Sequence, residues 1–299
     1  MDAILRQTGI LFLLLALGFL ASKLGWLSRE TRGGISNILL YIVTPCVIVQ
    51  SFQYPSSAEK WRAMGVEAAI LAAFMLLGLA AGLLAFRKEG GARRATATFG
   101  TAMGNVGFMG VPVIGALVGD EGMLYVSVAM AVFNAICWTV GVRVFDKKAF
   151  QPKVLATSPV LYSVAIGLLL FLFQWRLPAL IDGVTEMVAA VATPLSMMVV
   201  GAILAESPAG AILKDRTAVL SAASRLILIP LLALGTCTLV GIRGEMRMIL
   251  VLISGMPSAT NTVLLSLVFH GDEELGSRMV VLSTLLYLPV VIGWMLILR

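Results

Sequence analysis

Charged residues are scarce in this chain of 299 residues. Asp, Glu, Lys and Arg make up 13% of the sequence, about half of the share usual in soluble proteins. Hydrophobic residues make up 59%, and the mean hydropathy is +0.98. A soluble domain needs polar residues to cover its exterior, so this composition excludes a cytosolic enzyme, a disordered chain and a disulfide scaffold. The sequence predicts an integral membrane protein.

Residues that bind metals or carry redox chemistry are also few. Cys46, Cys137 and Cys237 lie inside apolar segments without a CxxC spacing, and His270 is the single histidine. We interpret the cysteines as small buried hydrophobes and His270 as a solvated residue at a helix end. We therefore expect no metal and no cofactor. The sequence has no P-loop and, with one loop histidine, no Ser/His/Asp set, so we do not expect an enzyme.

Ten segments contain no Asp, Glu, Lys or Arg, and each is close to the roughly 20 residues that span a bilayer as a helix. The period-2 alternation of a membrane β-barrel is missing, because runs such as 70–86 are apolar on every side. The predicted fold is therefore an all-α integral membrane protein with ten transmembrane helices. The segments are 7–22, 33–58, 68–86, 95–119, 122–142, 154–175, 187–205, 226–242, 248–271 and 279–298.

The basic residues are distributed unequally between the two sides of this arrangement. Connections on one side carry 14 Lys and Arg, and those on the other side carry 7, with Arg225 set aside inside a span. The side with more basic residues is expected to be cytoplasmic, which places both termini on the non-cytoplasmic side of the inner (plasma) membrane. The net charge of +6 then reflects topology, and we expect no nucleic-acid partner.

The two halves of the chain resemble each other. At an offset of 149 residues, Gly18 matches Gly167, Trp26 matches Trp175, and Thr44-Pro45 matches Thr193-Pro194; 119–121 and 271–273 share Gly-Asp-Glu. We predict two five-helix repeats, 1–149 and 150–299. Because five is odd, the second repeat enters the membrane from the opposite side, as in many secondary transporters. The alternative is chance similarity between Leu-rich helices.

Spans four and nine contain residues that break helices. Residues 99–112 hold four glycines, Asn105 and a proline, and residues 253–262 hold Gly, Pro, Asn261 and four hydroxyl residues. Matched breaks of this kind are typical of a substrate site near the midplane. The alternative is packing glycines and tolerated kinks, and we interpret the GxxxG spacings at 78/82, 100/104 and 115/119 as close helix packing. The candidate binding residues are Asn105, Gly107, Gly110, Pro112, Pro257, Ser258, Thr260 and Asn261.

Carboxylates are missing from both broken spans, so no carboxylate-based sodium or proton site is visible. Glu67, Glu186 and Glu206 are predicted to lie solvated at helix ends. Arg225 is the one charge expected within a span. It is predicted either to snorkel to the cytoplasmic surface or to attract an anionic substrate.

Several of these motifs resemble those of the auxin efflux carrier family over essentially the whole chain. Residues 105–112 read Asn-Val-Gly-Phe-Met-Gly-Val-Pro, similar to that family's Asn-x-Gly-Phe-x-Gly-x-Pro, and residues 256–262 and 283–286 resemble its signatures in spans nine and ten. The resemblance implies inverted repeats whose spans four and nine cross at Pro112 and Pro257. It also implies a scaffold of spans one, two, six and seven, often dimeric, and a transport domain of the others that shifts like an elevator.

The resemblance further implies organic anions as substrates, such as malate, malonate or auxin. The connection between spans five and six is limited to about residues 146–157, which argues against the regulatory loop of plant carriers and against auxin as the natural substrate. We therefore expect a compact carrier for a small organic anion in the lipid bilayer, with a homodimer as a further possibility. The alternatives are a sodium-coupled symporter of the bile-acid carrier type, a passive channel and a membrane sensor.

Overall fold

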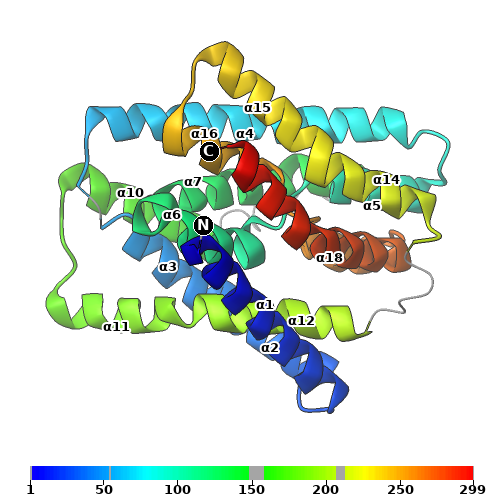
Figure 1. The fold of residues 1–299 in the computed structure, drawn as a ribbon, viewed down its shortest axis with the longest axis horizontal. Helices are drawn as coiled ribbons and strands as arrows, with labels where there is room; N and C mark the ends of the chain where they lie inside the picture. The colour runs from blue at the N-terminus through cyan, green and yellow to red at the C-terminus, as the bar shows by residue number, and fades with distance from the viewer. Residues whose placement is uncertain (1, 54, 148–157, 207–212, 299) are drawn as a thin grey trace. The chain divides into compact units, whose positions relative to one another are not determined.

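The computed structural model describes residues 2–53, 55–147, 158–206 and 213–298, and the named elements in these ranges are all helical (Figure 1). Segments labelled η are π-helical turns. The first half contains α1 (Asp2–Lys23), α2 (Arg29–Ile38), η1 (Leu39–Val43), α3 (Thr44–Ser51), α4 (Ala58–Ala85), α5 (Gly91–Ala102), η2 (Val106–Gly110), α6 (Val111–Val118), α7 (Asp120–Ile136), η3 (Cys137–Gly141) and α8 (Val142–Phe145). The second half contains α10 (Pro159–Phe173), α11 (Ala179–Ala190), α12 (Ala192–Glu206), α14 (Arg216–Ala223), η4 (Ser224–Leu228), α15 (Ile229–Val240), α16 (Gly244–Ser254), α17 (Asn261–Val268) and α18 (Glu273–Ile297).

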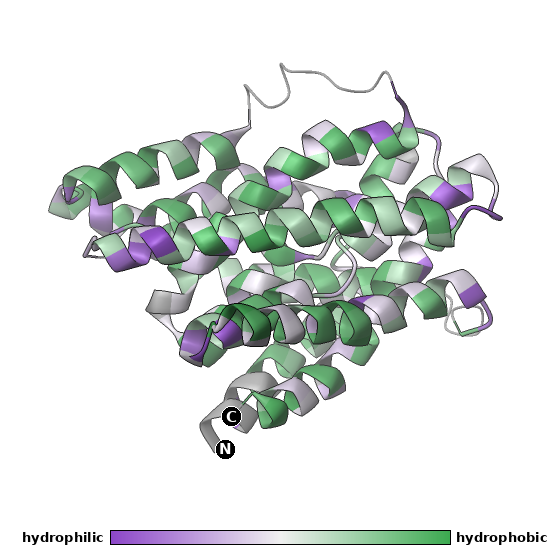
Figure 2. Cartoon of the chain, turned by 90° about the horizontal axis from the view of Figure 1, so that it is seen from above, coloured by the Kyte–Doolittle hydropathy of each residue, from purple (hydrophilic) through white to green (hydrophobic). Residues whose placement is uncertain are grey.

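Five helical stretches of the described chain are long and apolar enough to cross a membrane, and the bent α18 makes a sixth. The five are Arg29–Ser51, Ala58–Ala85, Gly122–Phe145, Ala179–Ala205 and Arg216–Val240. Each of the ten predicted segments contains helix. Several of these helices are too short to cross a membrane alone, such as α16 with 11 residues and α17 with 8. Hydrophobic residues run along the helices, and hydrophilic ones concentrate towards helix ends and connections (Figure 2). The protein is therefore a multi-pass helical membrane protein.

Of the four π-helical turns in the described residues, three directly precede a helix with proline in its first two positions. Pro45, Pro112 and Pro230 follow η1, η2 and η4 in this way. Proline has no N–H and its ring clashes with the carbonyl four residues earlier, so the turn before it widens. These prolines are therefore accommodated inside continuous helix and do not end it.

The chain divides into two compact units, and each unit takes segments from both halves of the sequence. Unit 1 consists of residues 1–67, 107–131 and 156–206, and unit 2 of residues 68–106, 132–155 and 207–299. The unit boundaries fall inside α4, η2 and α7, so these elements each contribute to both units.

Unit 1 is built from two reciprocal helix pairs. Helix α1 packs along α12, and α3 packs against α10 and α11 (Figure 1). A Cβ atom added at Gly18 would collide with the backbone of Met198, and one at Gly167 would collide with the ring of Phe52. The first helix of each half thus uses a glycine at the matched position to approach the second membrane segment of the other half.

Unit 2 surrounds α5 with α8, α14, α17 and α18. Its apolar core includes the fully buried side chains of Phe99, Met103 and Cys137. A Cβ at Gly82 would lie 3.0 Å from the backbone of Thr98, and one at Gly78 would lie 3.2 Å from the Cβ of Ala102. The predicted close packing at this GxxxG pair is therefore confirmed.

The predicted solvation of the glutamates was wrong for Glu67. Helix α4 begins at Ala58, ten residues before the predicted span, so Glu67 lies within the helix. Its carboxylate is fully buried, and both oxygens are without a hydrogen-bond partner among the described residues. The predicted span began too late because it was limited to residues without charge, whereas a membrane helix can contain a buried carboxyl group. The predicted exposure of His270 is confirmed.

Candidate functional site

Spans four and nine meet in unit 2 as two short antiparallel segments. The N–H of Asn105 donates to the carbonyl of Pro257 at 2.7 Å, and the N–H of Ala259 donates to the carbonyl of Met103 at 2.9 Å. Gly104 and Ser258 face each other between these two bonds. We call residues 103–105 and 257–259 the crossing. It is the point at which both helices are interrupted.

The crossing supplies partners for backbone groups that the broken helices leave free. Helix α5 ends at Ala102, and Met103 is extended with φ −103° and ψ 113°. In hydrocarbon an unpaired N–H or C=O group costs several kcal/mol, so a helix can stop there only where protein or a wet cavity receives those groups. At the crossing, the carbonyls of Met103 and Pro257 each accept a hydrogen bond from the other segment. The last carbonyls of α5 still need a donor.

Arg225 is that donor. Its side chain is 3% exposed, and Nε and Nη2 donate to the carbonyl of Met256 at 3.0 and 2.9 Å. Nη1 donates to the carbonyls of Ala102 at 3.1 Å and Thr101 at 3.4 Å. A Cβ at Gly104 would collide with Nη2, so any side chain there would displace the guanidinium from the position in which it holds these carbonyls. The snorkelling prediction was wrong, because burial keeps this side chain from the surface; anion attraction stays a prediction.

The π-helical turn η4 and a tryptophan hold Arg225 in position. Pro230 has no N–H to donate to the carbonyl of Leu226, four residues earlier. The indole Nε1 of Trp294 donates to that carbonyl instead, at 2.9 Å. The hydroxyl of Thr101 also donates to Ser221 Oγ at 2.8 Å, which ties α5 to the helix that precedes η4.

A hydroxyl group of α18 contacts the crossing, and several hydroxyls of spans nine and ten are buried. The N–H of Ser258 donates to Ser283 Oγ at 3.0 Å, and Ser283 in turn donates to the carbonyl of Met279. The buried hydroxyls of Ser258, Thr262, Thr284 and Tyr287 are without a hydrogen-bond partner within the described part of the chain. The candidates drawn from the sequence did not include Ser283, because it lies outside the helix-breaking patterns of spans four and nine.

The remaining candidates on span nine lie just beyond the crossing. Thr260 precedes α17 as its N-cap residue, and Asn261 is the first residue of that helix. The Nδ2 atom of Asn261 donates to the sulfur of Cys137 at 3.9 Å, so this amide contacts η3. Pro257 and Ser258 lie at the crossing itself, as does the buried Asn105.

The candidates Gly107, Gly110 and Pro112 lie beyond the crossing on span four, in the part of the chain that belongs to unit 1. Gly107 lines a cavity of about 20 Å³ there together with Thr44 and Ser196. The expectation that span four crosses at Pro112 was wrong. The chain crosses eight residues earlier, at Gly104, because the π-helical turn η2 accommodates Pro112 inside continuous helix.

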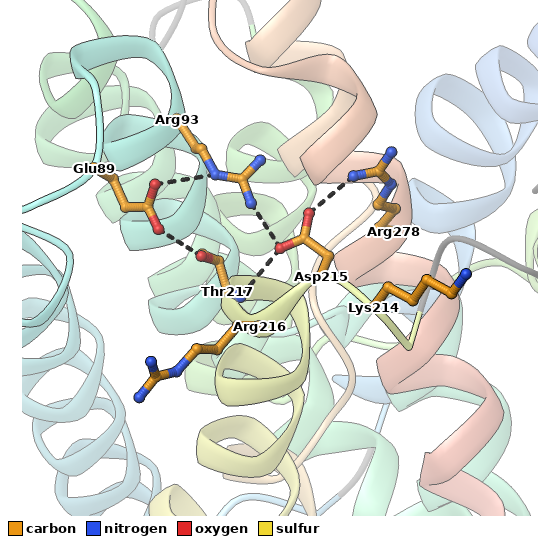
Figure 3. A pocket seen from close by; sticks show the side chains of 7 residues that line it. All are labelled: Glu89, Arg93, Lys214, Asp215, Arg216, Thr217 and Arg278. Atoms are coloured by element: carbon orange, nitrogen blue, oxygen red, sulfur yellow. Dashed lines mark hydrogen bonds and ion pairs between the residues drawn. The ribbon is translucent and has the colours of Figure 1, made fainter.

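A network of charged side chains joins three helix starts at one end of unit 2 (Figure 3). Asp215 caps α14 and accepts hydrogen bonds from Arg93 at 2.6 Å and from Arg278 at 2.9 Å. Arg93 also bonds Asp272, which caps α18, at 3.1 Å, and Glu89 at 3.1 Å. Lys214 and Arg216 point away from Asp215 in the same view, at the edge of an open cavity of about 480 Å³. This network fixes the ends of α5, α14 and α18 relative to one another.

Comparison with known proteins gives consistent results. The chain is 25% identical over 311 residues to an uncharacterized transporter of Methanocaldococcus jannaschii, covering 99% of each chain. It is 22% identical over 301 residues to a protein of Rhizobium meliloti named "Putative malonate transporter", covering 96% of this chain and 93% of that one. The membrane transport protein family model matches residues 3–156 and again residues 150–295. With these two matches and the motifs at residues 105–112 and 256–262, the chain belongs to the membrane transport protein family, the family of the auxin efflux carriers.

Proposed function

We propose that this transporter is a carrier for small organic anions, of the malate or malonate type or an auxin-like acid, that works by elevator-like alternating access. The observation that carries the proposal is a positive charge held at the crossing. Arg225 is buried and donates its hydrogen bonds to backbone carbonyls, and among the described residues no carboxylate pairs with it. A buried charge without a counterion favours an anion nearby, since the interior screens it weakly.

The polar groups around the crossing suit a carboxylate. The Asn105 and Asn261 amides and the Ser258 and Thr260 hydroxyls can donate hydrogen bonds to carboxylate oxygens. We propose these four as direct contacts, with Pro257 shaping the site at the crossing and Gly107, Gly110 and Pro112 shaping the helix that continues span four. Attraction of the anion by Arg225 acts through its charge, because the carbonyls of Thr101, Ala102 and Met256 already hold its N–H groups.

The wider architecture of the proposal follows the family. We propose ten spans in two inverted five-helix repeats, 1–149 and 150–299, with both termini outside and a homodimer as the assembly. The reciprocal packing of α1 on α12 and of α3 on α10 supports the repeat, because the pseudo-twofold axis of an inverted repeat would exchange these pairs. The malonate name of the Rhizobium meliloti relative supports a dicarboxylate among the acids to test first.

Counterflow in proteoliposomes tests the function. Vesicles loaded with unlabelled malonate, malate or an indole acid should take up the same labelled acid in a saturable way without a sodium gradient. Strict sodium dependence would instead support the symporter of the bile-acid carrier type. Flux without saturation or counterflow would support a channel, and binding without flux would support a sensor.

Asn105→Ala tests the site. We expect counterflow to fall by roughly tenfold or more, because one or two hydrogen bonds to a charged ligand are lost. Folding and insertion should be retained, since the backbone N–H of Asn105 still reaches Pro257. Asn37→Ala, the same change at an exposed position of α2, is the matched control and should leave counterflow unchanged. Normal counterflow by a well-folded Asn105→Ala protein would remove this residue from the site.

A further inference from the structure

The carbonyl oxygens around Arg225 form a set that would suit an inorganic cation. Thr101 and Ala102 belong to the last turn of α5, and Met256 follows the end of α16. Both helix ends carry a partial negative charge, and uncharged carbonyl oxygens are common ligands of hard cations in proteins. In this protein the guanidinium of Arg225 occupies that position, with three of its nitrogens bonded to these oxygens.

We propose that Arg225 is a fixed cation that replaces an inorganic ion at the crossing, so that the carrier keeps the crossing assembled without sodium. This inference rests on the proposed carrier function. It makes Arg225 a positioning residue, which acts through the backbone of the crossing and needs no contact with the substrate. Since the cation is covalently attached, it stays bound in every conformation that preserves the crossing.

Two further observations support a fixed cation over a packing role. Gly104 leaves no room for a side chain against Nη2, which brings the guanidinium onto the crossing backbone itself. A cavity of about 20 Å³, comparable to the space of one water molecule, adjoins Arg225 and is lined also by Gly104, Ile229 and Ser254. Removal of the side chain would enlarge this space next to the three carbonyl oxygens.

Chemical rescue of Arg225→Ala tests the proposal. We expect the variant to lose counterflow by roughly tenfold or more, because several charge-assisted hydrogen bonds disappear together. Millimolar guanidinium should restore part of the rate, and urea, a neutral molecule of similar shape, should not. Arg216→Ala removes an exposed arginine from the same helical stretch and should behave as wild type in both solutions.

A thermal-unfolding measurement in detergent gives a readout that needs no substrate. Guanidinium at the same low concentration should raise the unfolding temperature of Arg225→Ala and leave that of the wild type unchanged or slightly lower. If no acid shows counterflow with the wild type but this selective stabilisation is seen, the carrier proposal fails while the fixed cation stands. If Arg225→Ala does not fold, counterflow by Arg225→Gln tests the inference, since the neutral amide of glutamine can still donate hydrogen bonds but carries no charge.

Several results would overturn the inference. These are wild-type counterflow by folded Arg225→Ala or Arg225→Gln, rescue by urea as good as rescue by guanidinium, and the absence of any guanidinium effect on a folded Arg225→Ala. Strict dependence of wild-type counterflow on sodium would also overturn it, since the fixed charge would then not replace the ion. Low activity of Arg225→Gln together with sodium-independent wild-type counterflow supports it.

Discussion

The sequence and the structure give different reasons for the glycine at position 104. The sequence places it in a GxxxG spacing with Gly100, which indicates helix packing. Gly100 does pack in this way, because a Cβ there would lie 2.9 Å from Thr262 Cγ2. Gly104 lies beyond the end of α5, where the guanidinium of Arg225 takes the space of a side chain. Spacing alone cannot reveal this contact, since Arg225 is 121 residues away in the sequence.

Gly104→Ala should therefore destabilise the protein. The added methyl group collides with Nη2 of Arg225, and overpacking of this kind costs about 1–3 kcal/mol. Thermal unfolding in detergent measures the effect, and counterflow should fall with it. Gly235→Ala makes the same change on α15, where a Cβ meets open space, and should leave the unfolding temperature unchanged or slightly raised. Equal behaviour of the two variants would contradict the role assigned to Gly104.

Asp215 is expected to make stability depend on pH. Burial raises the pKa of its carboxyl, but hydrogen bonds from Arg93 and Arg278 lower it by more, so the pKa lies below its ordinary value of 3.8. Because the folded-state pKa is the lower one, the carboxylate stabilises the fold at pH above its unfolded-state pKa. This contribution is lost as pH falls through the folded-state pKa.

Asp215→Asn should lower the free energy of unfolding at pH 7 by about 1–3 kcal/mol, because the Arg93 and Arg278 bonds lose their charged acceptor. The difference from wild type should shrink as the pH is lowered below about 4. Denaturant unfolding at several pH values measures both effects. Glu274→Gln changes a carboxylate whose side chain is 72% exposed in the same network and should change stability by at most about 1 kcal/mol. A difference that does not vary with pH would argue against an ionic role for Asp215.

At the scale of helices and turns, the sequence predicted which spans are broken but misplaced the break in span four. Glycine, proline and asparagine concentrate in both broken spans, and both contain the crossing. The misplacement arose because a proline can either end a helix or be accommodated within it, and Pro112 is accommodated by the π-helical turn η2. The choice depends on where a partner backbone is available, and for span four that partner is residues 257–259. Gly119 was predicted to pack, but it ends α6 with φ +78°, a conformation that glycine adopts without strain.

Ala259→Pro should weaken the crossing. It removes the N–H that donates to the carbonyl of Met103 and leaves that buried carbonyl without its donor, at a cost of about 1–3 kcal/mol. Unfolding temperature and counterflow should both fall. Ala179→Pro is the matched control, since Ala179 is the first residue of α11, where proline is tolerated. A stable and fully active Ala259→Pro protein would show that the crossing does not depend on this bond.

At the scale of the whole chain, the sequence predicted two related halves, and the family model matches the chain twice in the same order. The division into compact units was not predictable in this form. Each unit draws on both halves, and its limits cut through α4 and α7, which are continuous helices. Hydropathy reports which residues avoid water, and it does not say which distant segment each helix contacts. The burial of Glu67 was missed for the same reason.

Cysteine labelling tests the proposed membrane topology. Single cysteines would be introduced into a protein whose Cys46, Cys137 and Cys237 are replaced by serine. At Arg29 and Lys214, which are exposed on the side richer in basic residues, a membrane-impermeant maleimide should react from the cytoplasm alone. At the exposed Arg62 and Arg243 it should react from outside alone. Labelling of positions 62 and 214 from the same side would refute the odd number of spans proposed between them.

The collision between a side chain at position 104 and the guanidinium of Arg225 also has an evolutionary consequence. The two positions cannot drift independently, because a larger residue at 104 is acceptable once the residue at 225 is shorter, and an arginine at 225 survives where 104 stays glycine. Among diverging relatives these positions should therefore covary in spite of their distance in the sequence. In the laboratory, the effects of Gly104→Ala and Arg225→Ala should be strongly non-additive when the two are combined.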